Sequence, residues 1–111
     1  MIKQKDIVLI QFPFSNFSSG KVRPALVISN NEYNKICNDI VVCAVTTQIS
    51  DVEYKIIIDN KDLTNGYLPR KSCIRIDKPY SVLKNKVKKT QAHLSDLKYS
   101  EFVKANNRFI K

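Results

Sequence analysis

The chain has 111 residues, of which 43% are hydrophobic and 26% charged. We therefore expect one domain, residues 1–111, with a core large enough to need neither disulfides nor metal. No apolar run approaches the roughly 20 residues of a membrane span, which excludes a helical membrane protein. The net charge of +9 favours polyanionic partners, including nucleic acid or an acidic protein segment.

Positive charge is concentrated in the last quarter of the chain. Residues 1–83 contain eleven Lys and Arg against eight Asp and Glu, whereas residues 84–111 contain eight against two. Two interpretations of this basic tail remain open. It attracts RNA or an acidic segment of a protein partner, or it is a solvated face that keeps a small protein soluble.

The cysteines and the single histidine argue against a metal centre. Cys37, Cys43 and Cys73 show no CxxC spacing, and His93 is the only histidine, so the ligand set of a zinc site is incomplete. We expect no metal and no cofactor. The apolar part of the opening segment MIKQKDIVLIQF is short and lacks a small-residue cleavage site, so we expect a strand there and a cytoplasmic protein.

Short strands followed by one helix account for the pattern along the chain. Period-2 and apolar-run signals predict strands at residues 7–12, 25–29, 40–46, 53–58 and 73–76, with a short one at 80–83. Ser95 is expected to cap a helix with one apolar face, formed by Tyr99, Phe102, Val103, Asn106, Phe109 and Ile110. The order predicts a mainly β protein with helices (α+β), built as a small, strongly bent antiparallel barrel.

The segment GKVRPALVISN places a charged residue directly before an apolar strand. Pro24 lacks an N–H and suits the first position of a strand, and it holds Arg23 in an extended conformation. The guanidinium stays cationic, and its planar fork matches phosphate oxygens. Arg23 is therefore either a phosphate-binding residue or an ordinary exposed arginine at the mouth of a strand.

Two further strands carry polar residues near their ends. VVCAVTTQ ends in Thr46, Thr47 and Gln48, whose hydroxyls and amide emerge where an apolar strand leaves the core. In SCIRIDKP, alternation places Arg75 and Asp77 on one face of a strand. These two residues either act together on a phosphodiester or form a surface ion pair of little energetic value.

Together these segments resemble the MazF/PemK toxins of bacterial toxin–antitoxin systems. KDIVLIQFPFS, GKVRPALVIS, VVCAVTTQ and SCIRIDKP occur in the order and spacing of that family, and LSDLKYSEFVKANNRFI is similar to its closing helix. The resemblance covers nearly the whole chain. It implies an SH3-like barrel with a C-terminal helix, a homodimer, a cognate antitoxin protein as partner, and metal-independent cleavage of single-stranded RNA at short sequences.

Position by position, the resemblance assigns catalytic residues. Arg23 matches the catalytic arginine of the family's RP motif, and Thr46 matches the threonine of its T-x-Q strand. Arg75 and Asp77 match an Arg-x-Asp pair with catalytic functions in the Kid/PemK branch. Lys78 falls where several members carry Gln and is expected to contact RNA. A histidine that this branch has in its first loop has no counterpart in SNFSSGK.

In such a reaction RNA supplies its own nucleophile. The 2′-hydroxyl attacks the adjacent phosphate, expels the 5′-oxygen and leaves a 2′,3′-cyclic phosphate. The protein has to align the attack, accept a proton and stabilise charge on the phosphate oxygens. We expect Arg23 to bind the scissile phosphate and Thr46 to hydrogen-bond the phosphate or the 2′-hydroxyl. Asp77 is the expected base, with Arg75 orienting it or binding phosphate.

Other residues are expected to border the RNA. They come from two segments, residues 15–21 and 59–71, and from the ends of the polar strands. Aromatic side chains either stack on unpaired bases or pack across a dimer. The residues expected to contact RNA are Phe14, Phe17, Lys21, Thr47, Gln48, Tyr67 and Lys78.

Three alternatives remain open at this point. The first is a nucleic-acid-binding barrel without catalytic activity, which needs only a basic face. The second is a toxin of similar fold that inhibits a protein such as DNA gyrase. The third is a toxin with an intact fold and no activity, a possibility that the missing loop histidine leaves open.

Overall fold

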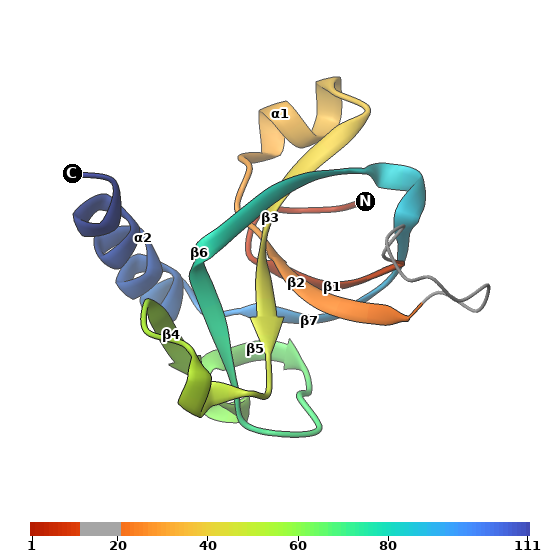
Figure 1. Ribbon diagram of the computed structural model, residues 1–111. Helices are drawn as coiled ribbons and strands as arrows, with labels where there is room; N and C mark the ends of the chain where they lie inside the picture. The colour runs from red at the N-terminus through yellow and green to blue at the C-terminus, as the bar shows by residue number, and fades with distance from the viewer. Residues whose placement is uncertain (12–20) are drawn as a thin grey trace.

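The computed structural model describes residues 1–11 and 21–111. Within these ranges the strands form one antiparallel, seven-stranded sheet of order β4-β6-β3-β2-β1-β7-β5 (Figure 1). The strands are β1 Asp6–Gln11, β2 Val22–Val27, β3 Asp39–Thr46, β4 Lys55–Ile58, β5 Leu63–Gly66, β6 Ser72–Leu83 and β7 Val87–Leu94. The helices are α1 Asn31–Ile36 and α2 Asp96–Ile110, with three single-turn 3₁₀ helices, η1 Ile49–Asp51, η2 Asn60–Asp62 and η3 Lys84–Lys86.

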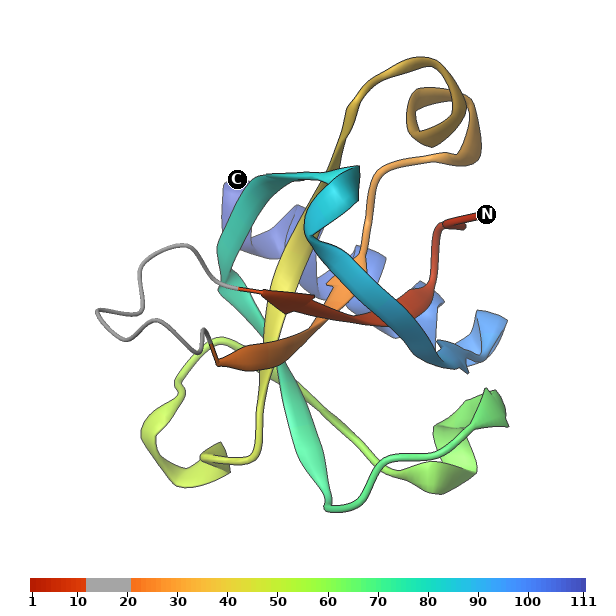
Figure 2. The same ribbon diagram turned by 90° about the vertical axis from the view of Figure 1, so that its right-hand side faces the viewer.

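The sheet curls because its two edges are joined by a short connection. In a flat sheet, β4 and β5 would lie about 29 Å apart, since each of the six steps between strands is about 4.8 Å. In the chain, however, only residues 59–62 separate Ile58 at the end of β4 from Leu63 at the start of β5, a reach of at most about 18 Å. Views 90° apart show β3 and β6 crossing β1 and β2 steeply (Figures 1 and 2). The expected small bent antiparallel barrel is confirmed.

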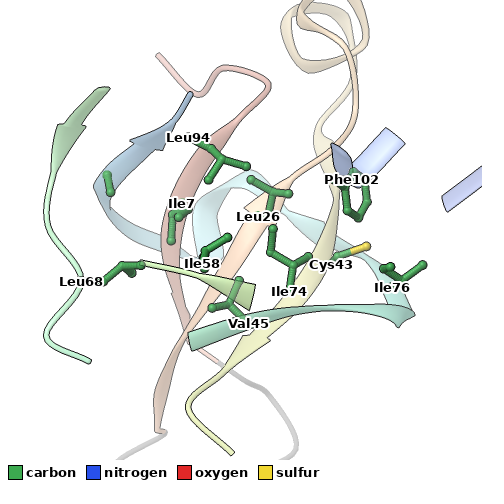
Figure 3. Packing of buried hydrophobic residues seen from close by; sticks show 11 residues of the cluster. Ile7, Leu26, Cys43, Val45, Ile58, Leu68, Ile74, Ile76, Leu94 and Phe102 are labelled. Carbon is green, nitrogen blue, oxygen red and sulfur yellow. The ribbon is translucent and has the colours of Figure 1, made fainter. Parts of the chain in front are cut away.

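The core has two parts, one on each side of the curled sheet. One contains Ile7, Leu26 and Ile74 together with Phe102 of α2 (Figure 3). The other contains residues of β1 and β2 that alternate with those of the first part and face the opposite side of the sheet, such as Val8 and Val27. Because both faces of β1 and β2 are covered, the sequences DIVLI and ALV are nearly continuous apolar runs.

Several elements differ from the sequence-based expectation. The two strands expected at 73–76 and 80–83 are one long strand, β6, which continues through Pro79. Helix α1 and strands β5 and β7 were not predicted. On α2, Phe102 is buried, whereas Val103, Phe109 and Ile110 of the predicted apolar face are exposed. Only the first half of that face therefore packs in the core of this chain.

Gly66 shows why β5 lies so close to β7. Its φ is +76°, and a Cβ at this position would lie 2.1 Å from the backbone carbonyl oxygen of Gln91. Only glycine tolerates both the angle and the approach.

Candidate active site

The site forms where β2 and β3 separate. The ladder between them runs from Val27 opposite Val42 to Ala25 opposite Ala44 and then stops. The next residue of β2 is Pro24, which has no N–H to donate to a ladder. Among the described strands, Pro24 and Arg23 are paired with β1 but not with β3, so they border an opening between the ends of β2 and β3.

A bend in β6 closes this opening from the other side. Cys43 of β3 pairs with Pro79, but Val45 pairs with Ile74, so residues 75–78 of β6 lie opposite a single residue of β3. The extra length belongs to a large bulge that turns β6 away from β3. The backbone N–H of Ile76 donates to the carbonyl of Tyr54 at 3.1 Å, which anchors the bulge on the β4 side.

The result is a pocket of about 390 Å³, here called the strand-end pocket. It brings together residues from β2, β3 and β6 that lie far apart in the sequence. Arg23, Arg75 and Lys78 supply positive charge to its wall. Its lining residues are Arg23, Pro24, Ala44, Val45, Thr46, Arg75, Lys78 and Tyr80.

Arg75 and Asp77 form a bidentate ion pair. Nε of Arg75 donates to Oδ1 of Asp77 at 3.1 Å, and Nη2 donates to Oδ2 at 2.9 Å. The guanidinium lowers the pKa of the Asp77 carboxyl below its usual range, because the charged form is hydrogen-bonded and faces a cation. Arg75 lines the pocket, whereas Asp77 does not. The Asp77 carboxylate therefore holds the Arg75 guanidinium in place from outside the pocket lining.

Thr46 is half-buried at the end of β3, and its hydroxyl is oriented by the backbone. Oγ1 of Thr46 accepts a hydrogen bond from the N–H of Gln48 at 3.1 Å. The O–H of the same hydroxyl can then donate to a ligand oxygen, because a hydroxyl accepts and donates at once. This places a neutral donor next to the three cations of the pocket.

Tyr80 also lines the pocket, although it was not among the predicted site residues. Burial raises the pKa of its phenol to about 12, with a further contribution from Cys43, and the Arg23 charge opposes the shift. The side chain is therefore a neutral hydroxyl at physiological pH. The alternation of β6 contains a signal for it, since Tyr80 is two residues from Lys78 and shares its face.

Among the other expected RNA contacts, none that the structure describes lines the strand-end pocket. Thr47 lines a second pocket that also contains Pro24. Lys21, Gln48 and Tyr67 are exposed, and the Tyr67 carbonyl accepts from Nε2 of Gln91 at 3.1 Å. The expected contacts in the first loop, Phe14 and Phe17, lie outside the described residues.

His93 takes no part in the strand-end pocket. Its Nδ1 lies 2.7 Å from Oδ1 of the buried Asp6, its partner across β1 and β7, and it lines a different pocket with Lys3 and Thr90. Within residues 1–11 and 21–111, no group of three His, Cys, Asp or Glu side chains is arranged to hold a metal.

Comparison with known proteins places this geometry in context. A family model described as "PemK-like, MazF-like toxin of type II toxin-antitoxin system" matches residues 3–109. A protein named Endoribonuclease MazF from Staphylococcus saprophyticus is 26% identical over 102 residues, which are 91% of this chain and 84% of that protein. In the described part of the chain, no helix is long and apolar enough to cross a membrane.

Solved structures show the same fold. An endoribonuclease from a mycobacterial species, in complex with its cognate antitoxin, superposes with a TM-score of 0.79 at 14% identity and covers 99% of this chain and 95% of its own. MazE-MazF from Deinococcus radiodurans gives 0.78 at 17% identity, with 98% and 95% covered. With a family model that spans almost the entire sequence, the chain belongs to the PemK-like, MazF-like toxins of type II toxin–antitoxin systems.

Proposed function

We propose that the protein is an endoribonuclease toxin that cleaves single-stranded RNA at the strand-end pocket without metal, and that a cognate antitoxin protein inhibits it. The observation that carries the proposal is the convergence of Arg23, Thr46, Arg75 and Lys78 on one pocket. Three cations and a hydroxyl donor are suited to a phosphodiester, whose charge increases on the non-bridging oxygens during attack.

In the proposed reaction, the pocket binds the scissile phosphate and aligns the neighbouring 2′-hydroxyl for attack. Arg23 and Arg75 stabilise the charge that develops on the non-bridging oxygens. Thr46 donates a hydrogen bond to one of these oxygens. The bond between phosphorus and the 5′-oxygen breaks, the 2′-oxygen takes its place, and a 2′,3′-cyclic phosphate remains on the upstream fragment. The 2′-hydroxyl gives its proton to solvent water, and the 5′-oxygen takes up a proton from water and leaves as the hydroxyl of the downstream fragment.

Asp77 is assigned a positioning function in place of the general base expected from the sequence. Both of its oxygens accept from Arg75, and its pKa is lowered. A carboxylate with a lowered pKa is a weaker base than a free one, because efficient general bases have a pKa near the working pH. The ion pair with Asp77 instead holds the planar guanidinium of Arg75 in a fixed orientation toward the pocket.

The test of this proposal is the Arg23→Ala variant assayed on a long single-stranded RNA. We expect the cleavage rate to fall at least about a hundredfold, the scale of removing one group that stabilises transition-state charge. Circular dichroism should show an unchanged fold, because Arg23 is exposed. Cleavage should persist in excess EDTA and should leave a 2′,3′-cyclic phosphate.

Arg108→Ala is the matched control, since Arg108 is an exposed arginine in the last turn of α2, and it should cleave as the wild type does. An Arg23→Ala variant that cleaves at the wild-type rate would remove Arg23 from the site. Wild-type protein that binds RNA but leaves its ends intact would support the non-catalytic barrel. Growth arrest without RNA cleavage would support a gyrase-directed toxin.

The proposal includes a homodimer. It is supported by the exposed Tyr54 and Phe109, whose ring centroids lie 5.1 Å apart. Ile57 of β4 and Ile110 of α2 are exposed apolar residues as well. Sedimentation velocity should give twice the chain mass for the wild type and a shift towards monomer for Phe109→Lys. A monomeric wild type at micromolar concentration would contradict this part.

A further inference from the structure

A second pocket, here called the side pocket, adjoins the strand-end pocket. Its volume is about 340 Å³, within the usual range of small-molecule sites. Pro24 lines both pockets, and Thr47 of the side pocket directly follows Thr46 of the strand-end pocket. The two pockets therefore share a wall at Pro24 and lie next to each other.

The walls of the side pocket are apolar and held in place. Leu9 and Pro24 come from β1 and β2, and Leu68 and Pro69 from the segment between β5 and β6. That segment is fixed by the amide of Asn60, whose Oδ1 accepts from the Leu68 N–H at 2.7 Å and whose Nδ2 donates to the Leu68 carbonyl at 3.0 Å. Preformed apolar walls of this kind contact the faces of a flat ring.

Gln91 supplies a polar group whose position is set by a β-bulge. Along β7, Ala92 pairs with Ile7 and Thr90 pairs with Val8, so Gln91 is the extra residue of the bulge and lines the side pocket. Bulges redirect a side chain out of the regular alternation and are frequent next to active sites. The close approach of Gly66 to the Gln91 carbonyl fixes the backbone at this point.

The amide of Gln91 is also oriented. Its Nε2 donates to the Tyr67 carbonyl at 3.1 Å, which fixes the plane of the amide. A fixed amide presents both a donor and an acceptor, the combination that reads the edge of an unpaired base. The described lining residues of the side pocket include one cation, Arg70, and no carboxylate, so the pocket is compatible with a polyanionic chain.

We propose that the side pocket holds one nucleobase of the RNA, next to the scissile phosphate, and that Gln91 reads its edge and so determines the base preference at that position. The inference rests on the proposed endoribonuclease function. Its basis is the contiguity of the two pockets, the apolar walls and the bulge at Gln91. A protein side chain of the antitoxin is the competing occupant.

The experiment compares cleavage profiles on an RNA with randomised sequence, with the ends of the products sequenced after limited digestion. For Gln91→Leu, we expect the base preference at one position beside the cut to fall about tenfold, the scale of one base-edge contact, with the other positions unchanged. The matched control is Gln4→Leu. Gln4 is also half-buried and donates from Nε2 to a backbone carbonyl, that of Ile28, at 2.9 Å, but it lines neither pocket.

Thr47→Val tests a second lining residue of the side pocket. Because Thr47 is exposed, the change leaves the core intact, and it should alter preference at the same position. Unchanged profiles in both variants would overturn the inference while the cleavage function stands, as would a uniform loss of rate. Variants that lose antitoxin binding but keep the RNA profile would also overturn it. A wild type that cleaves no RNA would overturn the proposed function, and the inference with it.

Discussion

At the scale of single residues, the Arg75–Asp77 pair shows how a local contact changes the chemistry of a site. The side chains are two residues apart on one face of β6, and each is about one-quarter exposed. The pairing keeps Asp77 ionised to a lower pH than a free carboxylate. It also occupies the oxygens that a general base would use, which is why we assign a positioning function to Asp77.

This assignment predicts a mild phenotype for Asp77→Asn. The Asn carbonyl still accepts from Arg75, so we expect the cleavage rate to fall by about tenfold or less, with an unchanged pH profile. Loss of a general base would instead reduce the rate by about 10²–10⁴-fold.

Asp39→Asn is the control for the Asp77 variant. Oδ1 of Asp39 accepts from the Tyr33 hydroxyl at 2.9 Å, and this carboxylate lines none of the pockets described above. A loss above a hundredfold for Asp77→Asn, together with a wild-type rate for Asp39→Asn, would restore Asp77 as the base.

At the scale of elements, α2 is held on the sheet by a few contacts near its first turns. Ser95 caps the helix by accepting from the Lys98 N–H at 3.2 Å. The Tyr99 hydroxyl donates to the Ile28 carbonyl at 3.2 Å. Phe102 packs in the core with Leu26 and Cys43 and is 2% exposed (Figure 3). The helix therefore depends on Phe102 for most of its apolar burial.

Phe102→Ala should lower the free energy of unfolding by about 3–5 kcal/mol, because the change removes a buried ring and leaves a cavity. Urea unfolding followed by circular dichroism measures the loss. Leu97→Ala on the same helix, where the side chain is 78% exposed, should change the free energy by less than about 0.5 kcal/mol. Equal effects of the two substitutions would show that α2 is not anchored at Phe102.

At the scale of the whole molecule, buried groups that must stay protonated limit stability at high pH. Burial raises the pKa of the Cys43 thiol from 9.0 to about 12. It also raises the pKa values of Tyr80 and Tyr99 from 10.0 to about 12. In each case the pKa of the folded state exceeds that of the unfolded state. The contribution of each protonated group to the free energy of unfolding is therefore complete below the pKa of its unfolded state. It is lost as the pH rises toward 12.

Between pH 8 and pH 10 the contribution of Cys43 to the free energy of unfolding should fall by about 1.4 kcal/mol, because the unfolded thiol ionises while the folded thiol does not. Urea unfolding at both pH values measures this. We expect Cys43→Ala to lose less stability over the interval than the wild type. Cys37→Ala, a change at a partly exposed thiol, should behave as the wild type. Identical losses in all three proteins would contradict the prediction.

The sequence by itself determined much of the fold, because most of the strands carry strong local patterns. Apolar runs marked β1 to β4, and the cap and apolar spacing marked α2. Strand β7 escaped prediction because its first half carries Lys88, Lys89 and Thr90 on exposed positions. Pairing with β1 and β5 makes it a strand, and such pairing is invisible to a local pattern.

The residues of the site also divide into those that the sequence predicted and those that only the tertiary structure placed there. Arg23, Thr46 and Arg75 could be predicted because each stands at a strand end or on an alternating face next to an apolar run. Alternation places Tyr80 on the face of Lys78, but the tertiary structure decided that it joins the others in one pocket. The tertiary structure alone decided that the bulge at Gln91 borders a second pocket. Both depend on where a ladder is interrupted, at Pro24 and within β6 and β7. The physical reason is that the register between strands is set by contacts distant in sequence, whereas the residues of each strand are set locally.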